Sequence, residues 1–363
     1  MKKKWLYGSL VLVMALGSIS AADHFFDISR NIDVFTAVYK DVNGSYVDDT
    51  DPSKLMRTCI DGMLKTLDPF TNYISESQIE TYRIQNSEKL VGIGIHFQIV
   101  DSLPVVTDLI KDLPADKGGI QIGDKMTALD GQPTRGKSYD EVSQVLRGQT
   151  GSNLTISLKT ISGSKKDVTI ARQEFMETNV PFSGMLTPEV GCINLKIFNP
   201  DAGKDVKAAY EKLKKDNPNM KGIILDLRGN PGGLLAEAVN VVNVFIDKNK
   251  LVVTTKGRVS EWNSTFKTLN EPADTKIPIV VLTNNMSASS SEIVSGSLQD
   301  YDRAVILGQK TYGKGLVQIT KNLSYNTMLK VTTAKYYIPS GRCIQAINYA
   351  ERNEDGSVKH ILV

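Results

Sequence analysis

The sequence predicts an α/β protein in which alternating strands and helices form a core that also carries a β-rich module and an N-terminal helical segment. Apolar residues follow a helical spacing from about residue 28 to 88, and a strand-like alternation from about 90 to 170. Beyond Arg172, short apolar runs bounded by turn residues alternate with helical stretches, as in an α/β core. The length of 363 residues also exceeds what one hydrophobic core usually organises.

The composition argues against a nucleic-acid partner. Hydrophobic content of 41% and charged content of 23% are typical of a globular protein. Without the three lysines at positions 2–4, the formal charge of +3 falls to zero. A neutral body without a basic stripe has no electrostatic attraction for DNA, RNA or an anionic membrane surface.

The sequence also offers little for a metal or a disulfide. Cys59, Cys192 and Cys343 are odd in number and far apart, which fits neither a disulfide framework nor a zinc spacing. With only three histidines beside them, we expect no metal and no other cofactor.

Residues 1–22 have the pattern of a secretory signal. The three lysines precede an apolar run from Leu6 to Ile19, and the small residues 20–22 follow, with a cleavage point after Ala22. The run is shorter than the roughly 20 apolar residues that usually span a bilayer. The alternative is an uncleaved anchor in the inner membrane. Both interpretations place the body outside the cytoplasm, in the cell envelope or periplasm.

Residues 23–88 form the predicted helical segment. Two sets of apolar residues recur at helical spacing: Ile32, Phe35, Val38 and Tyr39, then Leu55, Cys59, Met63 and Leu64. Asp68 and Pro69 break the pattern with a turn. Such a segment either packs on the body of the protein or pairs with a second copy of the chain.

Residues 89–173 form the predicted β-rich module. Strand-like runs begin at Val91 and Leu103, a third passes through residues 123–131 into a turn, and a fourth covers 153–159. Between the last two, a helix is expected from Ser138 to Leu146 with Ser138 as its cap. A short helix or turn is expected at residues 115–120.

This order of elements, with Gly-Ile-Gly-Ile before the first good strand, resembles a PDZ domain. In such modules a glycine-rich turn offers backbone N–H groups to the terminal carboxylate of a peptide, and the peptide adds to the sheet edge as a strand. The resemblance assigns peptide binding to Gly92, Ile93, Gly94 and Ile95, with Val142 and Leu146 lining the side-chain pocket. Taken alone, glycines at a strand start more often permit a tight bend.

Residues 174–363 form the predicted α/β core. The apolar runs expected as strands are Gly191–Phe198, Gly222–Leu227, Ile277–Leu282, Ala304–Leu307 and the late run Thr332–Ile338. The helical stretches between them are Asp205–Lys215, Leu234–Ile246 and Ser291–Asp300.

Two segments of this core suit acyl-transfer chemistry. The glycine-rich turn 226–233 leads from a strand end into a helix and exposes N–H groups suited to a developing oxyanion, although a plain tight turn explains it as well. The serine cluster 287–291 followed by Glu292 is a good helix cap. A serine at this place also gains from the positive end of the helix dipole, which favours a nucleophilic alkoxide.

The third segment, Gly313-Lys314-Gly315, supplies a base. It nearly spells a phosphate-binding loop, but the serine or threonine and the helix that such a loop requires after the lysine are missing, which excludes nucleotide binding. Lys314 and Gln318 share a strand face, so that Gln318 can orient the lysine. His24, His96 and His360 lie far from both motifs along the sequence, which leaves a serine activated by a neutral lysine.

With these motifs together, the chain resembles a carboxyl-terminal processing, or tail-specific, protease of peptidase family S41. The resemblance rests on Gly-Ile-Gly-Ile, Asp-Leu-Arg-Gly-Asn-Pro-Gly-Gly, Ser-Ala-Ser-Ser-Ser-Glu and Gly-Lys-Gly-Leu-Val-Gln. It implies a ClpP/crotonase-like core and carries over one set of roles. These are Ser289 as nucleophile, Lys314 as base, Gln318 as its partner, the amides of Gly232 and Ser290 as oxyanion hole, and Arg147 as the residue that couples ligand binding to activity.

The resemblance therefore implies an exported serine endopeptidase that recognises apolar C-terminal tails of proteins through its PDZ domain. Further partners left open are a second copy bound through the N-terminal helices and an adaptor lipoprotein. Ser290 replaces the usual alanine, and relatives continue well past residues 340–345, so we expect a C-terminally truncated core. Alternatives are an inactive peptide-binding scaffold and, on fold analogy alone, an acyl-CoA enzyme.

Overall fold

The structure is a computed structural model that describes residues 25–85, 89–352 and 358–360. The predicted signal or anchor segment lies outside these residues. No helix within them is long and apolar enough to cross a membrane. The chain divides into one unit that ends at Pro69 and a second that begins at Phe70.

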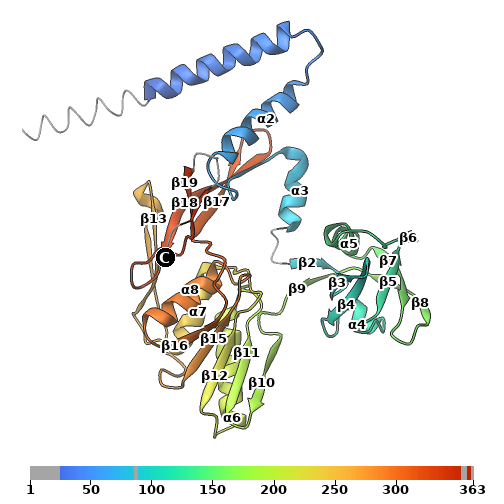
Figure 1. Ribbon diagram of the computed structural model, residues 1–363, viewed down its shortest axis with the longest axis vertical. Coiled ribbons are helices and arrows are strands. Elements are labelled where there is room, and N and C mark those ends of the chain that lie inside the picture. Colours follow the sequence, from blue (N-terminus) through green and yellow to red (C-terminus); the bar gives the residue numbers. More distant parts are fainter. Residues whose placement is uncertain (1–24, 86–88, 353–357, 361–363) are drawn as a thin grey trace, which may run out of the picture. The chain divides into compact units, whose positions relative to one another are not determined.

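The first unit consists of helices, as the apolar spacing predicts. A helix covers residues 25–45, and α2 (Pro52–Lys65) follows it (Figure 1). The side chain of Asp51 caps α2 by accepting a hydrogen bond from the Lys54 amide. On the first helix, Ile32, Phe35 and Val38 are each about half exposed, so this unit presents an apolar row.

The second unit begins with a strand that the helical spacing did not predict. Strand β1 (Asn72–Ile74) follows the turn at Asp68–Pro69 and pairs with β18 (Thr327–Tyr337). More than 250 residues separate the two strands, and local periodicity carries no information about such a pairing. Helix α3 (Glu76–Gln85) then completes the segment expected to be helical.

The β-rich module has the predicted order of elements. Its sheet runs β3-β4-β5-β7-β8, with β6 paired to β5. The strands are β3 (Ile95–Val100), β4 (Leu103–Leu109), β5 (Lys125–Leu129), β6 (Gln132–Pro133), β7 (Asn153–Lys159) and β8 (Lys165–Ala171). Helices α4 (Pro114–Lys117) and α5 (Tyr139–Leu146) complete it.

The predicted cap of α5 is present. The Glu141 amide donates to Ser138 Oγ at 3.3 Å, and the Ser138 amide donates to Glu141 Oε2 at 2.7 Å. The buried apolar side chains of α5 join those of the sheet in one cluster. Beside the module, β2 (Lys89–Gly92) and β9 (Gln173–Met176) pair as a two-stranded ribbon that brings its entry and exit together.

The α/β core contains a five-stranded sheet of order β10-β11-β12-β15-β16 (Figure 1). Its strands are β10 (Phe182–Thr187), β11 (Val190–Asn194), β12 (Gly222–Asp226), β15 (Ile279–Thr283) and β16 (Ala304–Gly308). The last four are parallel. Helices α6 (Ala202–Asp216), α7 (Leu235–Phe245) and α8 (Ser290–Asp300) share its hydrophobic core.

A second, antiparallel sheet is organised around β18. This strand pairs with β1, with β13 (Leu251–Gly257) and with β17 (Leu316–Leu323), while β14 (Ser264–Lys267) pairs with β13. The late strand predicted at residues 332–338 therefore begins five residues earlier, at Thr327. It begins there because it forms a hairpin with β17, closed by Tyr325 and Asn326 in the left-handed region.

Candidate active site

The serine cluster lies between β15 and α8, at the carboxyl end of a central parallel strand. Three of its hydroxyls are used to hold the loop. Ser287 donates to the Leu227 carbonyl, Ser290 to that of Gly233 and Ser291 to that of Asn230, at 2.8–2.9 Å. All three serines are buried.

Ser289 differs from the other serines of the cluster. It is partly exposed, and its hydroxyl donates to no group in the described part of the chain. Its backbone has φ 54° and ψ −111°, an uncommon conformation for a residue other than glycine. Such strain, at the start of a helix and beside a free hydroxyl, is characteristic of a serine held out for reaction.

The glycine-rich turn that follows β12 contacts this serine directly. Asn230 is fully buried, its side chain donates to the Leu195 carbonyl at 2.7 Å, and its own carbonyl accepts from the Ala288 amide at 3.0 Å. A Cβ placed on Gly232 would lie 2.9 Å from Ser289 Cβ and 3.0 Å from the Ser290 nitrogen. The turn and the nucleophile loop are therefore packed as closely as backbone allows.

The two predicted oxyanion donors lie side by side but differ in their hydrogen bonds. The Ser290 amide, at the first turn of α8, has no hydrogen-bond acceptor among the described residues. The Gly232 amide donates to Asn230 Oδ1 at 2.9 Å. Ser290 thus offers a free N–H, whereas the Gly232 N–H is occupied by a side chain of its own turn.

An ion pair anchors the start of the turn. Arg228 donates to both oxygens of Asp226, at 2.9 and 2.7 Å. Burial raises the pKa of Asp226, but the hydrogen bonds from Arg228 outweigh it and hold the pKa below its usual range. The carboxylate therefore stays ionised and keeps the last residue of β12 fixed.

Lys314 lies on the loop that leads into β17. It is partly buried, and its pKa is lowered by that burial and by the nearby charge of Lys330. Both effects favour the neutral amine that a general base requires. Lys314 Nζ lies 4.9 Å from the centre of the Phe70 ring, and no hydrogen bond joins it to Ser289 within the described residues.

Gln318 lies on β17, four residues after Lys314. Its side-chain amide donates to Thr332 Oγ1 on β18 at 3.2 Å. The Thr71 hydroxyl in turn donates to Thr332 Oγ1 at 3.4 Å. Gln318 is therefore bound to the antiparallel sheet, and Lys314 is not its hydrogen-bond partner.

Glu292 is a site residue that the sequence indicated only as a helix-capping residue. Its side chain is buried, and its carboxylate accepts hydrogen bonds from three amides: Ser289 at 2.7 Å, Gly313 at 2.6 Å and Lys314 at 2.9 Å. Burial raises its pKa even though these bonds oppose the shift. In the sequence the signal was a glutamate three residues after Ser289. The Lys314 amide, which also donates to this glutamate, lies 22 residues further along the chain.

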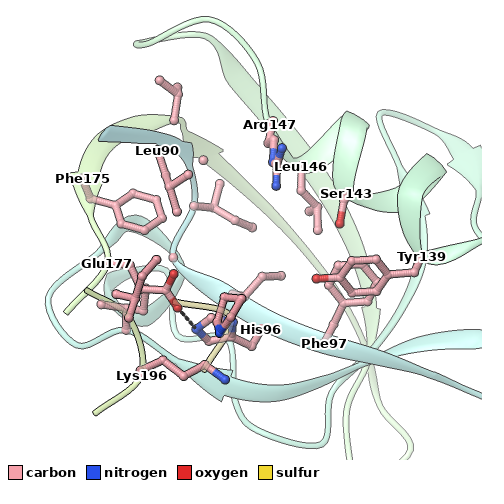
Figure 2. A pocket seen from close by; sticks show the side chains of 18 of the residues that line it. Leu90, His96, Phe97, Tyr139, Ser143, Leu146, Arg147, Phe175, Glu177 and Lys196 are labelled. Atoms are coloured by element: carbon pink, nitrogen blue, oxygen red, sulfur yellow. Dashed lines mark ion pairs between the residues drawn. The ribbon is translucent and has the colours of Figure 1, made fainter. Parts of the chain in front are cut away.

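The PDZ-like module carries a cavity of about 360 Å³ between β3 and α5 (Figure 2). The predicted residues Gly92, Ile93, Gly94, Ile95 and Leu146 line it, and so does Arg147. The amides of Ile93 and Gly94 donate to no group within the described residues. This arrangement leaves N–H groups for a peptide carboxylate beside an arginine.

The structure differs from the sequence prediction at Val142. Its side chain is fully buried in the core of the module, and the next residue, Ser143, lines the cavity instead. Val142 and Leu146 do lie on neighbouring turns of α5, but the rotation of the helix turns Val142 toward the sheet. Periodicity gives the spacing of such a pair, and only the packed helix gives its direction.

The cavity extends beyond the module. Lys196, Gly229 and Pro231 of the α/β core also line it, and the last two belong to the turn that contacts Ser289. In this cavity His96 Nε2 lies 3.8 Å from Glu177 Oε1 (Figure 2). The groove expected to hold a peptide tail and the turn expected to hold an oxyanion therefore border one space.

The described residues contain no group of three or more His, Cys, Asp or Glu side chains arranged to hold a metal ion. Cys192 is buried in β11, and burial raises the pKa of its thiol. Such a thiol is a poor nucleophile.

Comparison with known proteins places both parts of this second unit. Residues 189–351 match peptidase family S41, and residues 105–160 match a PDZ domain. A relative from Staphylococcus aureus (strain N315) named "Probable CtpA-like serine protease" is 38% identical over 317 residues. These cover 86% of this chain and 62% of the relative, so the chain spans less than two thirds of that protein's length.

Solved structures agree with these matches. The photosystem II D1 C-terminal processing protease is similar over 86% of this chain and 89% of its own, with 26% identity and a TM-score of 0.51. A Bacteroides fragilis protein assigned to the S41 proteases covers 81% of this chain and 80% of its own, at 17% identity and a TM-score of 0.57, and supports the fold. The Ser289 loop and the Lys314 loop both lie inside residues 189–351, so the chain contains a peptidase S41 domain that includes both loops, together with a PDZ domain.

Proposed function

We propose that the chain is an exported serine endopeptidase that hydrolyses peptide bonds with Ser289 and Lys314. The observation that carries the proposal is the contrast within the serine cluster. Three hydroxyls donate to backbone carbonyls, whereas the fourth, on the strained Ser289, donates to no group among the described residues. Glu292 then ties the Ser289 loop to the Lys314 loop through their backbones.

The proposed reaction has two stages. Ser289 Oγ attacks the carbonyl carbon of the substrate while the neutral Lys314 amine takes the hydroxyl proton. The resulting ammonium gives this proton to the leaving amine as the C–N bond breaks, which leaves an acyl-enzyme. In the second stage Lys314 takes a proton from water, and the hydroxide attacks the ester carbonyl. The ammonium then returns this proton to Ser289 Oγ as the ester C–O bond breaks, which releases the new carboxyl terminus and restores both residues.

The oxyanion of each tetrahedral intermediate would be held by the amides of Ser290 and Gly232. Ser290 can donate at once. The Gly232 amide must first break its hydrogen bond to the Asn230 side chain. The oxyanion hole therefore has both of its donors only when substrate is bound. Gln318 would orient the lysine in the reacting arrangement, after leaving Thr332.

Substrate selection is assigned to the PDZ groove. An extended tail would add to β3, place its carboxylate at the amides of Ile93 and Gly94 near Arg147, and bury its last side chain against Leu146. Ile93, Ile95 and Leu146 among the lining residues favour an apolar terminal side chain. Arg147 would couple binding of the carboxylate to the α/β core, because the same cavity is lined by Gly229 and Pro231.

Export and self-association complete the proposal. Residues 1–22 would direct the chain out of the cytoplasm or anchor it in the inner membrane. The apolar row of the first helix would pair with a second copy of the chain, since about half of each side chain is exposed. An adaptor lipoprotein would be an additional partner.

The test is cleavage of an unstructured protein that ends in apolar residues, followed by mass spectrometry. Wild-type protein should cut it, and Ser289→Ala and Lys314→Ala should each lose at least about 10³-fold in kcat/KM. Turnover by Lys314→Ala at the wild-type rate would refute the dyad.

The second candidate is a peptide-binding scaffold without catalysis. Two observations favour it: the Gly232 amide is occupied, and the Lys314 ammonium lies over the Phe70 ring without a hydrogen bond to Ser289 among the described residues. A fluorophosphonate probe decides between the candidates. Labelling of Ser289 supports the peptidase, while tail binding with neither labelling nor cleavage supports the scaffold.

A further inference from the structure

The side chain of Lys314 rests against an aromatic ring from a distant part of the chain. Its ammonium lies over the face of Phe70 at 4.9 Å from the ring centre, within the range of a cation–π contact. Among the described residues Lys314 Nζ forms no hydrogen bond and no ion pair. Phe70 lies outside the three segments for which the sequence predicted a catalytic role.

The ring is held in place by the antiparallel sheet. The next residue, Thr71, is buried and its hydroxyl accepts from the Thr332 amide at 3.2 Å. Asn72 then opens β1, where it pairs with Lys330 of β18. The ring also meets Tyr349 edge to face, with centroids 6.2 Å apart. Phe70 is therefore fixed where the lysine lies.

The two forms of the lysine respond to this ring in opposite ways. The negative face of an aromatic ring attracts an ammonium but gives a neutral amine little stabilisation. A general base, in contrast, works only as the neutral amine. A ring under the ammonium therefore favours the resting form of the dyad, in which Ser289 keeps its proton and donates it to no group.

We propose that Phe70 is a positioning residue for the dyad, whose ring holds the charged Lys314 away from Ser289 until the lysine has lost its proton to solvent. The inference rests on the proposed Ser289–Lys314 chemistry. It adds a residue some 220 positions before the nucleophile to the groups that control that chemistry. The released amine is then free to take the proton of Ser289.

Burial and two charged groups also act on the charge of Lys314. Burial and the ammonium of Lys330 lower its pKa, whereas the carboxylate of Glu292 raises it. The Phe70 ring, like the Glu292 carboxylate, should raise the pKa of Lys314 because it stabilises the ammonium. Its removal should therefore lower the pH at which the lysine becomes a base.

The test is the pH dependence of the rate at which a fluorophosphonate labels Ser289, which bypasses the PDZ groove. Phe70→Met keeps an apolar side chain of similar size. In this variant the acid limb of the pH–rate profile, where the rate rises as Lys314 loses its proton, should move to lower pH by about 0.5–1 unit. Labelling at pH 7 should then rise about 3- to 10-fold. Phe70→Tyr keeps a π face and should retain the wild-type limb.

Trp262→Leu is the matched control. It removes another ring that lies under a lysine of the same sheet, since Lys321 Nζ lies 5.5 Å from the Trp262 ring, but that lysine has no part in the dyad. The acid limb should stay at its wild-type position in this variant. A shift equal to that of Phe70→Met would assign the effect to the sheet in general and overturn the proposal.

Two outcomes separate this inference from the proposed function. If Lys314→Ala abolishes labelling while Phe70→Met keeps the wild-type limb, the dyad stands and the role of Phe70 is refuted. If Lys314→Ala labels at the wild-type rate, the dyad itself is wrong. The position of the limb does not depend on how much protein is folded, and Phe70→Leu repeats the test if Phe70→Met folds poorly.

Discussion

Glu292 and Lys314 are joined by a hydrogen bond of 2.9 Å from the lysine amide to the glutamate carboxylate. The same carboxylate accepts from the Ser289 amide. A single buried side chain thus sets the spacing between the proposed nucleophile and base through their backbones, and leaves both functional groups free.

Replacement of Glu292 by glutamine should separate the two loops. The amide has one acceptor oxygen where the carboxylate has two, and its NH₂ group would face a backbone N–H. We expect kcat/KM to fall by about 10- to 1,000-fold, because small misplacements of reacting groups are costly. Peptide cleavage by Glu292→Gln and by the wild type, compared at equal folded concentration, measures this loss.

Glu237→Gln is the control for that experiment. Glu237 also accepts from a backbone amide, that of Gly203 at 2.8 Å, but it lies on α7. Its replacement should change thermal stability slightly and activity not at all. Equal losses of activity in both variants would show that the effect is general destabilisation.

Lys330 should tune the pH dependence of cleavage. Its charge lowers the pKa of Lys314, so Lys330→Met should raise that pKa and move the acid limb of kcat/KM to higher pH. The sign follows because the active form is the neutral amine, whose fraction grows as pH rises through the pKa. Below the limb we expect a rate about 3- to 10-fold lower than that of the wild type. A limb that stays in place would exclude this role.

Gly232 should tolerate no side chain. A Cβ there would lie 2.8 Å from the Ala288 carbonyl oxygen and would need a φ of +104°. Gly232→Ala should therefore lose most fluorophosphonate labelling, by about 10²-fold or more. Gly131 has φ +76° and open space around it, so Gly131→Ala tests backbone strain without crowding. It should lower stability by about 1 kcal/mol and keep full labelling.

Arg147 should contribute to the binding of a free carboxyl terminus. Its guanidinium lines the groove beside the amides of the Gly-Ile-Gly-Ile turn (Figure 2). Arg147→Ala should weaken an apolar-tailed peptide about 5- to 20-fold in fluorescence polarisation, as expected for a lost charge-assisted contact. An amidated peptide should bind both proteins with equal, lower affinity. Arg135→Ala, an exposed change in the same module, should leave binding unaltered.

The sequence predicted what depends on neighbours along the chain. The helical first unit, the order of elements in the module and the strands of the parallel sheet are all present, because apolar spacing and turn residues determine them locally. The serine cluster and Lys314 stood out because each lies within a short motif that contains small residues, and Ser289 was chosen within the cluster by resemblance to a family. Resemblance to a family added their roles.

What the sequence did not predict depends on contacts across the fold. Phe70 reaches Lys314 through a pairing of β1 with β18 that no periodicity reveals. The engagement of Gly232 by Asn230, and of Gln318 by Thr332, depends on which rotamers pack best. Val142 was assigned to the groove because it is spaced one helical turn from Leu146. Spacing alone cannot tell which side of a helix meets the sheet.

The proposed nucleophile and the proposed base come from two different sheets. Ser289 follows a strand of the parallel sheet, while Lys314 leads into the antiparallel sheet around β18. A slide of one sheet against the other would abolish the proposed activity while every helix and strand stayed intact. Circular dichroism and melting curves would record such material as native, so the quality of a preparation has to be judged by titrating reactive serine.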